Sequence, residues 1–437
     1  MNIGFIPIDN RPVCCTLPLQ IASVDESIKL FMPKREWLGN LEKYADTDKI
    51  FEWLSTLPKM DAFIVSLDTI AYGGLISSRR SSDSYEQIKS KIEKFKSLIK
   101  ADKIYAFSSI MRISNNNINQ EEKEYWSEYG KKIFEYSFNL DKNGMTETDI
   151  PEEILEDYLS TRERNFEINK IYLDWQKEGF FDTLVFSKDD CAEFGMNVRE
   201  AKELQKLGGF VKTGADEIPL TLLARAIKKD LTVNPIFLEP YSKNLISNYE
   251  DVSVEKSVLG QLDLAEIKIS NNANTDLYIN NFKSNQGEIV MKIPTEPFSG
   301  IWETPKKPYM IADVRFANGG DNKLVGQFKP FDENFYGYSG WNTSANTLGS
   351  LICGAKVKYN AEKYNDRNFK KLQLIRLLDD WAYQANVRQK LEKPDSEMCK
   401  KLMKPFEEKA FELVGMRAEI SYSFPWNRLF EVEIEFN

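Results

Sequence analysis

Histidine is absent from all 437 residues of the chain. This absence excludes a Ser-His-Asp triad, a Cys-His pair and an imidazole-bound zinc ion, because each of these sites depends on an imidazole group. If the protein is an enzyme, carboxylates must therefore supply most of its acid and base chemistry, with Lys, Tyr or Cys as lesser candidates.

Several other common signatures are missing as well. The five cysteines have no CxxC spacing, which argues against a disulfide framework and a thiolate zinc site. No GxGxxG or GxxxxGK[ST] sequence occurs, so neither a dinucleotide fingerprint nor a P-loop is indicated. No apolar run approaches about 18 residues, the length of a membrane-spanning helix. The N-terminal MNIGFIPIDNRP has neither the charged n-region nor the apolar h-region of a signal peptide. We therefore expect a cytoplasmic protein without a membrane partner.

The charge balance is acidic, with a net charge of -9 and a pI near 5.1. This balance argues against a nucleic-acid partner and against an anionic membrane surface. The chain is 42% hydrophobic, which is enough to build a large core. The sequence leaves the oligomeric state open.

The most informative stretch is residues 182–225, which repeats the order strand, acidic turn, helix. The two turns hold the acid pairs Asp189/Asp190 and Asp216/Glu217, each just beyond the carboxyl end of an expected strand. Parallel α/β proteins keep their active sites at that end of the strands. These four acids are the predicted catalytic residues.

The same acids also suit the first turn of a helix. There each Asp or Glu stabilises the helix by about 0.3–1 kcal/mol, so capping alone would account for either pair. This structural alternative weakens when both pairs are considered together.

Polar residues also follow the β-prone runs 2–8, 61–67 and 103–108. For Asp9 and Arg11, which follow the first run, a local salt bridge or an Asx turn is the structural alternative. The functional prediction is that the polar residues after all three runs contact substrate, and they are Asp9, Arg11, Asp68, Tyr72 and Arg112.

Two runs in the second half, 309–314 and 335–339, lead into turns that contain glycine, asparagine and tryptophan. Tryptophan beside amides suits a sugar, because the indole packs on the apolar face of the ring and the amides bond its hydroxyls. A buried tryptophan with helix-capping asparagines is the alternative. The predicted sugar-binding residues are Asn318, Asp321, Trp341, Asn342 and Asn346.

About ten β-prone runs alternate with helical segments, which indicates an α/β protein. The fold expected from the row of polar strand ends is a (β/α)8-like TIM barrel in residues 1–355, with a helical insertion at 119–178. Residues 356–437 would form a small C-terminal α+β appendage, in which 368–391 has the pattern of one long helix. Two doubly wound α/β domains around a cleft are the alternative.

Ordered motifs along nearly the whole chain resemble the bacterial DUF4127 family: DNRPV, SLDTIAYGGLISSR, FSKDDCAEFG, TGADEIPLTLLARA, IADVRFANGGDN, GWNTSANTLG, DDWAYQANVR and PWNRLFE. This resemblance implies no particular activity. The adjacent acids in DD and GADE are also similar to those of barrel-fold β-N-acetylhexosaminidases. In those enzymes one acid of the pair orients the acetamido group and its neighbour protonates the leaving oxygen.

The leading hypothesis is a glycoside hydrolase that needs no cofactor and acts on a small glycan, as an exo-acting enzyme of β-N-acetylhexosaminidase type. Adjacent carboxyls split their pKa values, so one can hold a proton while the other stays ionised. Glu217 or Asp190 would donate the proton, with Asp216 or Asp189 as its partner.

Two other classes stay open. A divalent-metal-dependent phosphoryl-transfer enzyme or phosphatase could use Asp189, Asp190, Asp216 and Asp321 as oxygen ligands for Mg²⁺. A non-catalytic carbohydrate-binding protein would use Trp341 and the asparagines and would not need the acids.

Overall fold

The computed structural model describes residues 1–189 and 192–436. The chain divides by its internal contacts into two compact units. Unit 1 comprises Met1–Asn10, Leu30–Pro219 and Tyr249–Asp251, and unit 2 comprises Arg11–Lys29, Leu220–Asn248 and Val252–Asn437.

Unit 1 is built on a six-stranded sheet with the order β2-β1-β3-β4-β5-β6. Each neighbouring pair from β1 to β6 in this order is parallel. Every residue of β3 and β4 is buried, as expected for strands covered on both faces. The strands are β1 (Asn2–Ile6), β2 (Lys29–Phe31), β3 (Ala62–Ser66), β4 (Ile104–Ile110), β5 (Thr183–Lys188) and β6 (Phe210–Thr213).

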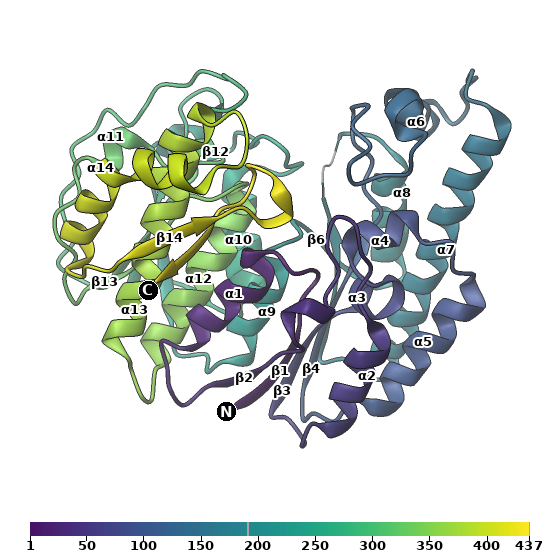
Figure 1. Ribbon diagram of the computed structural model, residues 1–437, viewed down its shortest axis with the longest axis horizontal. Helices are drawn as coiled ribbons and strands as arrows, with labels where there is room; N and C mark the ends of the chain where they lie inside the picture. The colour runs from purple at the N-terminus through teal and green to yellow at the C-terminus, as the bar shows by residue number, and fades with distance from the viewer. Residues whose placement is uncertain (190–191, 437) are drawn as a thin grey trace. The chain divides into compact units, whose positions relative to one another are not determined.

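The helices of unit 1 follow the apolar periodicity of their sequences. In α5, Ile88, Ile92 and Phe95 are fully buried, and Ser84 and Gln87 form a capping box at its start. Figure 1 shows α5 beside α7, which it contacts. The helices are η1 (Arg35–Trp37), α2 (Thr47–Thr56), α3 (Leu67–Tyr72), α4 (Leu75–Arg80), α5 (Tyr85–Leu98), α6 (Trp126–Asn143), α7 (Glu152–Lys177) and α8 (Met196–Lys206), and α9 (Ile218–Ala226) continues into unit 2.

The segment expected to be helical at 119–178 contains α6 and α7. These two helices pack in an apolar cluster with Met111 and Met196, in which Trp126, Ile133 and Tyr158 are almost fully buried. The rings of Trp126 and Tyr158 lie 5.9 Å apart between their centroids. The remaining predicted boundaries, at residues 355 and 356, stay predictions.

Unit 2 contains a five-stranded sheet with the order β13-β11-β9-β7-β8, in which every neighbouring pair is parallel. The strands are β7 (Thr232–Phe237), β8 (Lys268–Ile269), β9 (Thr275–Asn280), β11 (Tyr309–Asp313) and β13 (Phe335–Ser339). Unit 2 also has two two-stranded sheets. In one, β10 (Gly287–Glu288) pairs with β12 (Phe316–Ala317) in parallel, and in the other, β14 (Ile420–Ser423) pairs with β15 (Glu433–Phe436) in antiparallel orientation.

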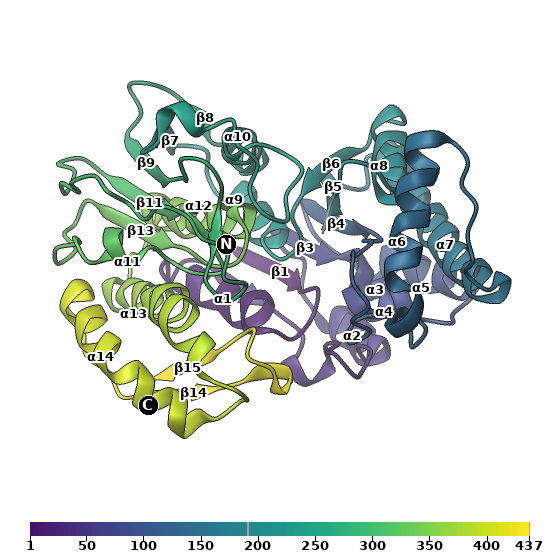
Figure 2. The same cartoon turned by 90° about the horizontal axis from the view of Figure 1, so that it is seen from above.

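Helices of unit 2 pack in a chain of contacts in which α10 touches α12, α12 touches α1, and α1 touches α13. Figure 2 shows these helices beside the strands, with α12 against β11 and β13. They are α1 (Pro12–Ala22), η2 (Pro240–Ser242), α10 (Val254–Leu264), α11 (Asn322–Val325), α12 (Ser344–Asn360), α13 (Asp366–Arg376), the π-helix η3 (Leu377–Val387), η4 (Arg388–Lys390), α14 (Ser396–Val414) and η5 (Pro425–Asn427).

An aromatic cluster around Trp302 packs on the strands of unit 2. The indole lies 5.2 Å from the ring of Tyr278 on β9, 6.2 Å from Tyr309 on β11 and 5.8 Å from Phe328, measured between ring centroids. The proline-studded segment before β11 therefore covers part of the sheet with aromatic side chains instead of a helix.

The predicted α/β class is confirmed, since both units combine helices with mainly parallel sheets. Numbered along the chain within each sheet, the strand orders are 2-1-3-4-5-6 and 2-1-3-4-5. Ligands of open α/β sheets bind beyond the carboxyl ends of the strands. Among the described residues, none of the helices has both the length and the apolar composition that a bilayer crossing requires.

Candidate functional site

At the carboxyl edge of the unit 1 sheet, two arginines share acidic partners. Arg112, just beyond β4, lies 2.8 Å from Glu121, 3.3 Å from Glu122 and 3.6 Å from Asp189, measured between nitrogen and carboxylate oxygen. Buried Arg79 lies 3.0 Å from Glu122 and 3.5 Å from Glu121. The predicted contact residue Arg112 is thus engaged by protein carboxylates, one of which is a predicted catalytic acid.

Asp68 stands at the start of α3, directly after β3, and is 1% exposed. Its Oδ2 accepts a hydrogen bond from the Ser109 backbone N–H at 2.9 Å. Burial raises the pKa of Asp68 to about 7 in spite of that bond. Tyr72 is buried on the same short helix, and burial raises its pKa well above the usual range.

Glu217 folds back onto the end of β6. Its Oε2 accepts from the backbone N–H of Ala215 at 3.1 Å. Gly214 has φ of +119°, and a Cβ there would collide with the Glu217 carboxyl, so only glycine permits this turn. Burial, helped by the Asp216 charge, raises the pKa of Glu217 to about 8.

The acid pairs of unit 1 therefore take different partners, with Asp189 facing Arg112 and Glu217 held by its own turn. Asp9 and Asp216 are buried, and Asp190 lies outside the described residues. The raised pKa of Glu217 agrees with a carboxyl that keeps its proton near neutrality, and the catalytic role of these acids stays a prediction.

In unit 2, a buried polar network ties the strand ends together. Asp313 accepts from Asn280 at 2.8 Å, from the Asp321 backbone N–H at 2.7 Å and from the Tyr338 hydroxyl at 3.1 Å. The fully buried Arg315 donates to Asn280 at 3.0 Å and lies 3.5 Å from Asp321. The predicted binding residue Asp321 thus belongs to the internal scaffold of this edge.

The predicted asparagines join turns to one another. Asn318 and Asn342 both have positive φ, and the N–H of Asn318 donates to the Asn342 carbonyl at 2.9 Å. Asn318 also donates to Glu288 at 2.7 Å. Asn346 donates to Thr343 at 3.2 Å, and its buried Oδ1 has no hydrogen-bond partner among the described residues. Asn318 and Asn342 thus connect turns, whereas the N-caps of α11 and α12 are Asp321 and Thr343, and the binding role of the asparagines stays a prediction.

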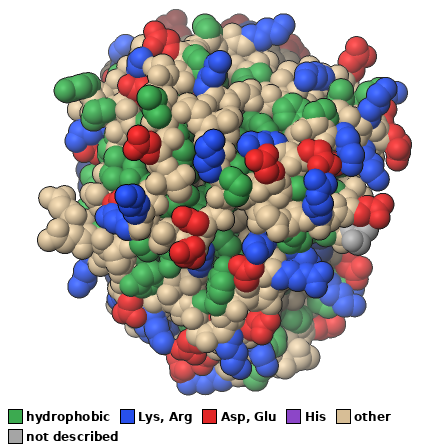
Figure 3. Space-filling model, turned by 90° about the vertical axis from the view of Figure 1, so that its left-hand side faces the viewer, with side chains coloured by type: hydrophobic (Ala, Val, Ile, Leu, Met, Phe, Trp, Pro, Cys, Tyr) green, Lys and Arg blue, Asp and Glu red, His purple; other side chains and the backbone are tan. Residues whose placement is uncertain are grey.

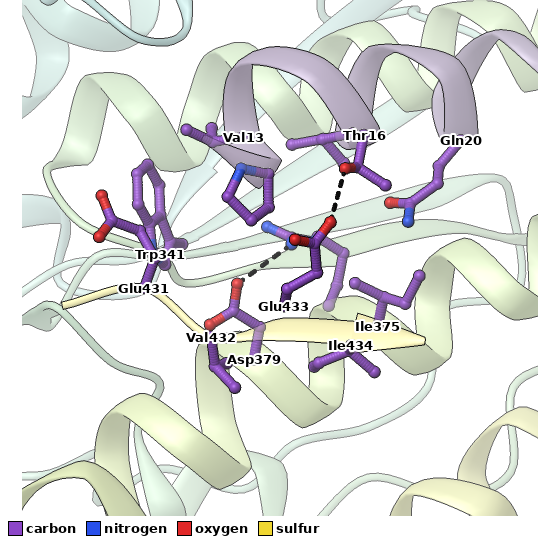
Figure 4. Close-up of a pocket in the computed structure, with 13 residues that line it drawn as sticks. Val13, Thr16, Gln20, Trp341, Ile375, Asp379, Glu431, Val432, Glu433 and Ile434 are labelled. Atoms are coloured by element: carbon purple, nitrogen blue, oxygen red, sulfur yellow. Dashed lines mark hydrogen bonds and ion pairs between the residues drawn. The ribbon is translucent and has the colours of Figure 1, made fainter. Parts of the chain in front are cut away.

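A pocket of unit 2 opens beside the end of β13, between α1, α13, η3 and the last strand. Its volume is about 430 Å³ with the open mouth counted, while the enclosed part holds about one water molecule. Figure 4 shows Thr16 of α1 and Glu433 of β15 pointing toward one another, with Asp379 approaching from η3. The lining residues are Pro12, Val13, Thr16, Leu17, Gln20, Trp341, Ile375, Arg376, Asp379, Glu431, Val432, Glu433 and Ile434.

Arg376 joins two adjacent acids at the point where α13 becomes the π-helix η3. Its guanidinium lies 3.3 Å from Asp379 and 3.1 Å from Asp380. Asp380 in turn accepts from the Ser339 hydroxyl at 3.0 Å and from the Gly340 N–H at 2.7 Å. The acid pair is therefore fixed to the end of β13, and single π-helical segments often occur at functional sites.

Asp379 is 8% exposed and is the acid of this pair that lines the pocket. Its Oδ1 accepts from Gln384 at 3.2 Å, five residues along the π-helix. Burial raises the pKa of Asp379 to about 7, with Asp380 and Glu431 adding to the rise and Arg376 opposing it. The carboxyl therefore holds its proton up to neutral pH.

Glu431 reaches the same pocket from the C-terminal tail. Arg428 grips it with two hydrogen bonds of 2.9 and 2.8 Å, and Arg11 lies 3.5 Å away. The two-point contact with Arg428 fixes the orientation of this carboxyl group. The predicted contact residue Arg11 thus supports a pocket acid, and its guanidinium also lies 5.3 Å from the Trp426 ring centroid.

The predicted sugar-binding residue Trp341 lies in the lining of this pocket and is only 4% exposed. Its ring lies 6.2 Å from Phe430 in an edge-to-face arrangement. In this conformation the indole forms a wall of the pocket and does not offer an open face to a sugar ring.

Asp379, Arg376 and Glu431 were missed by the reasoning from strand ends. Asp379 lies on a helix, and Glu431 lies in a tail segment with no strand of the main sheet before it. A signal for this pocket was present in four of the sequence motifs that resemble the DUF4127 family. Each of them contributes residues to the pocket lining, and they are DNRPV, GWNTSANTLG, DDWAYQANVR and PWNRLFE.

No group of three or more His, Cys, Asp or Glu side chains is placed to hold a metal ion in the described part of the chain. On the face shown in Figure 3, basic and acidic side chains are interspersed and do not gather by sign. A strong field of one sign is thus not evident on that face.

A sequence model of the family described as "Protein of unknown function (DUF4127)" matches residues 3–435. Searches of curated proteins and of solved structures gave no match. The fainter similarity to barrel-fold β-N-acetylhexosaminidases is not shown by these comparisons and stays a prediction.

Proposed function

The chain belongs to the DUF4127 family, whose description states no activity, and we propose that its unit 2 pocket hydrolyses glycosidic bonds with a pair of carboxyl groups. The proposal keeps the class of reaction expected from the histidine-free sequence and assigns it to Asp379 and Glu431. One observation carries it: a single pocket holds one carboxyl that keeps a proton to about pH 7 and another gripped by arginine.

In the proposed reaction, Asp379 gives its proton to the leaving oxygen as the glycosidic bond breaks. Glu431 takes a proton from the water that attacks the anomeric carbon, so that acid and base are restored after proton exchange with solvent. Environments that treat two acids differently are the usual means of assigning these roles. The small enclosed space suits the attacking water, and the sugar would occupy the open mouth.

Arg376 and Gln384 act here as positioning residues. Arg376 holds Asp379 and Asp380 together, and Gln384 donates both to Asp379 and, at 3.0 Å, to the carbonyl of Phe430 beside the tail. These contacts support a fixed orientation of the acid, which proton transfer in the transition state requires.

We also propose that each unit is a doubly wound sheet and not part of one (β/α)8 barrel. Supporting this alternative, both strand orders begin 2-1-3-4-5, the pattern of one doubly wound class. The pocket lies at the carboxyl end of β13, the edge where such sheets bind ligands.

The test is a screen of purified protein against aryl glycosides, including β-N-acetylglucosaminide and β-N-acetylgalactosaminide, with and without EDTA. We expect release that resists EDTA and falls at least about 100-fold in Asp379→Asn. Exposed Glu392 offers a matched control, since Glu392→Gln removes an acid far from any described contact of the pocket.

The outcomes separate the competing assignments. Loss of activity in Glu217→Gln with full activity in Asp379→Asn would move the site to unit 1. Activity only on phosphate esters with added Mg²⁺ would favour the metal-dependent class, and glycan binding without turnover would favour a carbohydrate-binding protein. The proposed partner is a small glycan in the cytoplasm, and the location stays a prediction from the sequence.

A further inference from the structure

A second pocket of unit 2 lies at the amino end of β13. The pocket lined by Asp379 is at the opposite, carboxyl end of this strand. The volume of the second pocket is about 810 Å³ with the open mouth counted. Its lining includes Phe331, Phe335 and Phe369, and the rings of Phe331 and Phe335 stack with centroids 3.6 Å apart. Phe335 is fully buried, so of this stacked pair the partly exposed Phe331 offers the apolar surface to a ligand.

Lys358, near the end of α12, brings an amine into this pocket. Its Nζ donates to the carbonyl of Phe335 at 2.6 Å and lies 4.0 Å from the ring centroid of Phe369 and 4.6 Å from that of Tyr336. Among the described residues, the amine thus has ring faces beside it and one hydrogen-bond acceptor, the Phe335 carbonyl.

Charged groups face Lys358 from two directions. Asp332 and Glu333 precede β13, and Asp366 and Lys370 lie on α13. Burial lowers the pKa of Lys358 to about 8, although the three acids oppose this change. At pH 7, Lys358 is then the neutral, nucleophilic amine in about a tenth of the molecules, compared with less than about a thousandth for an ordinary lysine.

We propose that Lys358 is a covalent binding site for small aromatic aldehydes, with the aromatic ring of the ligand packed against the partly exposed Phe331 and the edge of Phe369 that remains accessible. The amine nitrogen bonds to the carbonyl carbon, and the carbonyl oxygen leaves as water with the two hydrogens of the amine. The product is an imine, and no electrons are gained or lost in its formation. The proposal is independent of glycosidic hydrolysis at Asp379.

Lys356 is a control that the chain itself provides. It lies on the same helix two residues earlier, and burial lowers its pKa to about 8 as well. However, it is fully buried, donates to the Ala265 carbonyl at 2.7 Å and does not line the pocket. A comparison of the two lysines therefore separates access to the pocket from the ease of losing a proton.

The experiment incubates the full-length protein at pH 7 with 2-hydroxybenzaldehyde and traps imines with sodium cyanoborohydride, which supplies the hydride for reduction. Peptide mapping by mass spectrometry then gives the labelling rate at each lysine. We expect Lys358 to react at least about tenfold faster than the exposed Lys268 and Lys323, and Lys356 to stay unlabelled. The rate at Lys358 should saturate with aldehyde concentration, as binding before reaction requires.

A rate at Lys358 equal to that of the exposed lysines, or no labelling there, would overturn the proposal. A fast rate that rises linearly without saturation would also overturn it, because the amine would then be reactive without a binding pocket. Lys358→Arg keeps the positive charge over the rings, and in this variant the fast labelling phase should vanish while the other lysines react as before.

Discussion

Replacing Asp379 with asparagine should change how the stability of the protein depends on pH. The folded chain holds the Asp379 proton to about pH 7, whereas an unfolded aspartate releases it near pH 4. Between these values the folded state binds more protons than the unfolded state, so the free energy of unfolding falls as pH rises. Above the folded pKa this contribution no longer changes.

The expected size follows from one proton, about 1.4 kcal/mol per pH unit. Asparagine cannot titrate, so from pH 5 to pH 7 the stability of Asp379→Asn should rise relative to wild type by about 2–3 kcal/mol. The shifts of Asp68, Glu217 and Asp313 act in the same direction in both proteins and cancel in this difference. Asp380 titrates together with Asp379, and removal of the neighbouring negative charge lowers its pKa, which adds to the difference in the same direction.

Urea unfolding at pH 5, 6, 7 and 8 measures this difference, with Glu392→Gln as the control expected to follow wild type. Curves for wild type and Asp379→Asn that stay parallel within about 0.5 kcal/mol over this range would refute the reasoning. Asp379 would then ionise as an ordinary aspartate and could not serve as a proton donor near neutrality.

Three further predictions concern other parts of the chain. Arg315→Met should cost about 3–5 kcal/mol in urea unfolding, because it leaves Asp321 buried without its guanidinium; a cost below about 1 kcal/mol would contradict the account. Ser84→Ala should cost about 1 kcal/mol by removing the capping box of α5, seen as a lower Tm, and an unchanged Tm would count against it. Gln384→Met should raise the pKa of Asp379, because a hydrogen bond that favours the charged form is lost, and so should move the alkaline limb of a pH–rate profile upward; an unmoved limb would show that Gln384 does not tune the acid.

Much of the secondary structure could be predicted because it depends on local sequence patterns, namely continuous apolar runs and apolar residues at helical spacing. The continuous apolar runs became the buried strands β3 and β4, and the periodic Ile88, Ile92 and Phe95 became the inner face of α5. Residues 368–391 were expected to form one helix, whereas the structure has α13 followed by a π-helix. The hydrogen bonds of Asp380 to Gly340 and of Gln384 to Phe430 are tertiary contacts, and apolar periodicity does not encode them.

In the candidate sites, too, local sequence patterns predicted some residues, whereas residues brought together by tertiary contacts were missed. The strand-end rule located acids with raised pKa values at Asp68 and Glu217, because their position follows directly from the preceding strand. It could not find Asp379 and Glu431, since the pocket forms only when the C-terminal tail meets α1 and η3. The sequence alone does not predict these contacts between segments that lie far apart along the chain.

The most direct test of the proposed hydrolysis compares two aryl glycosides that differ only in their leaving group. A dinitrophenolate leaves without a proton, whereas phenol needs one from the enzyme. We predict that Asp379→Asn loses at least about 100-fold in kcat/KM on the phenyl glycoside and less than about tenfold on the dinitrophenyl glycoside. Equal losses on both substrates, or no loss on either, would contradict the assignment of Asp379 as the proton donor.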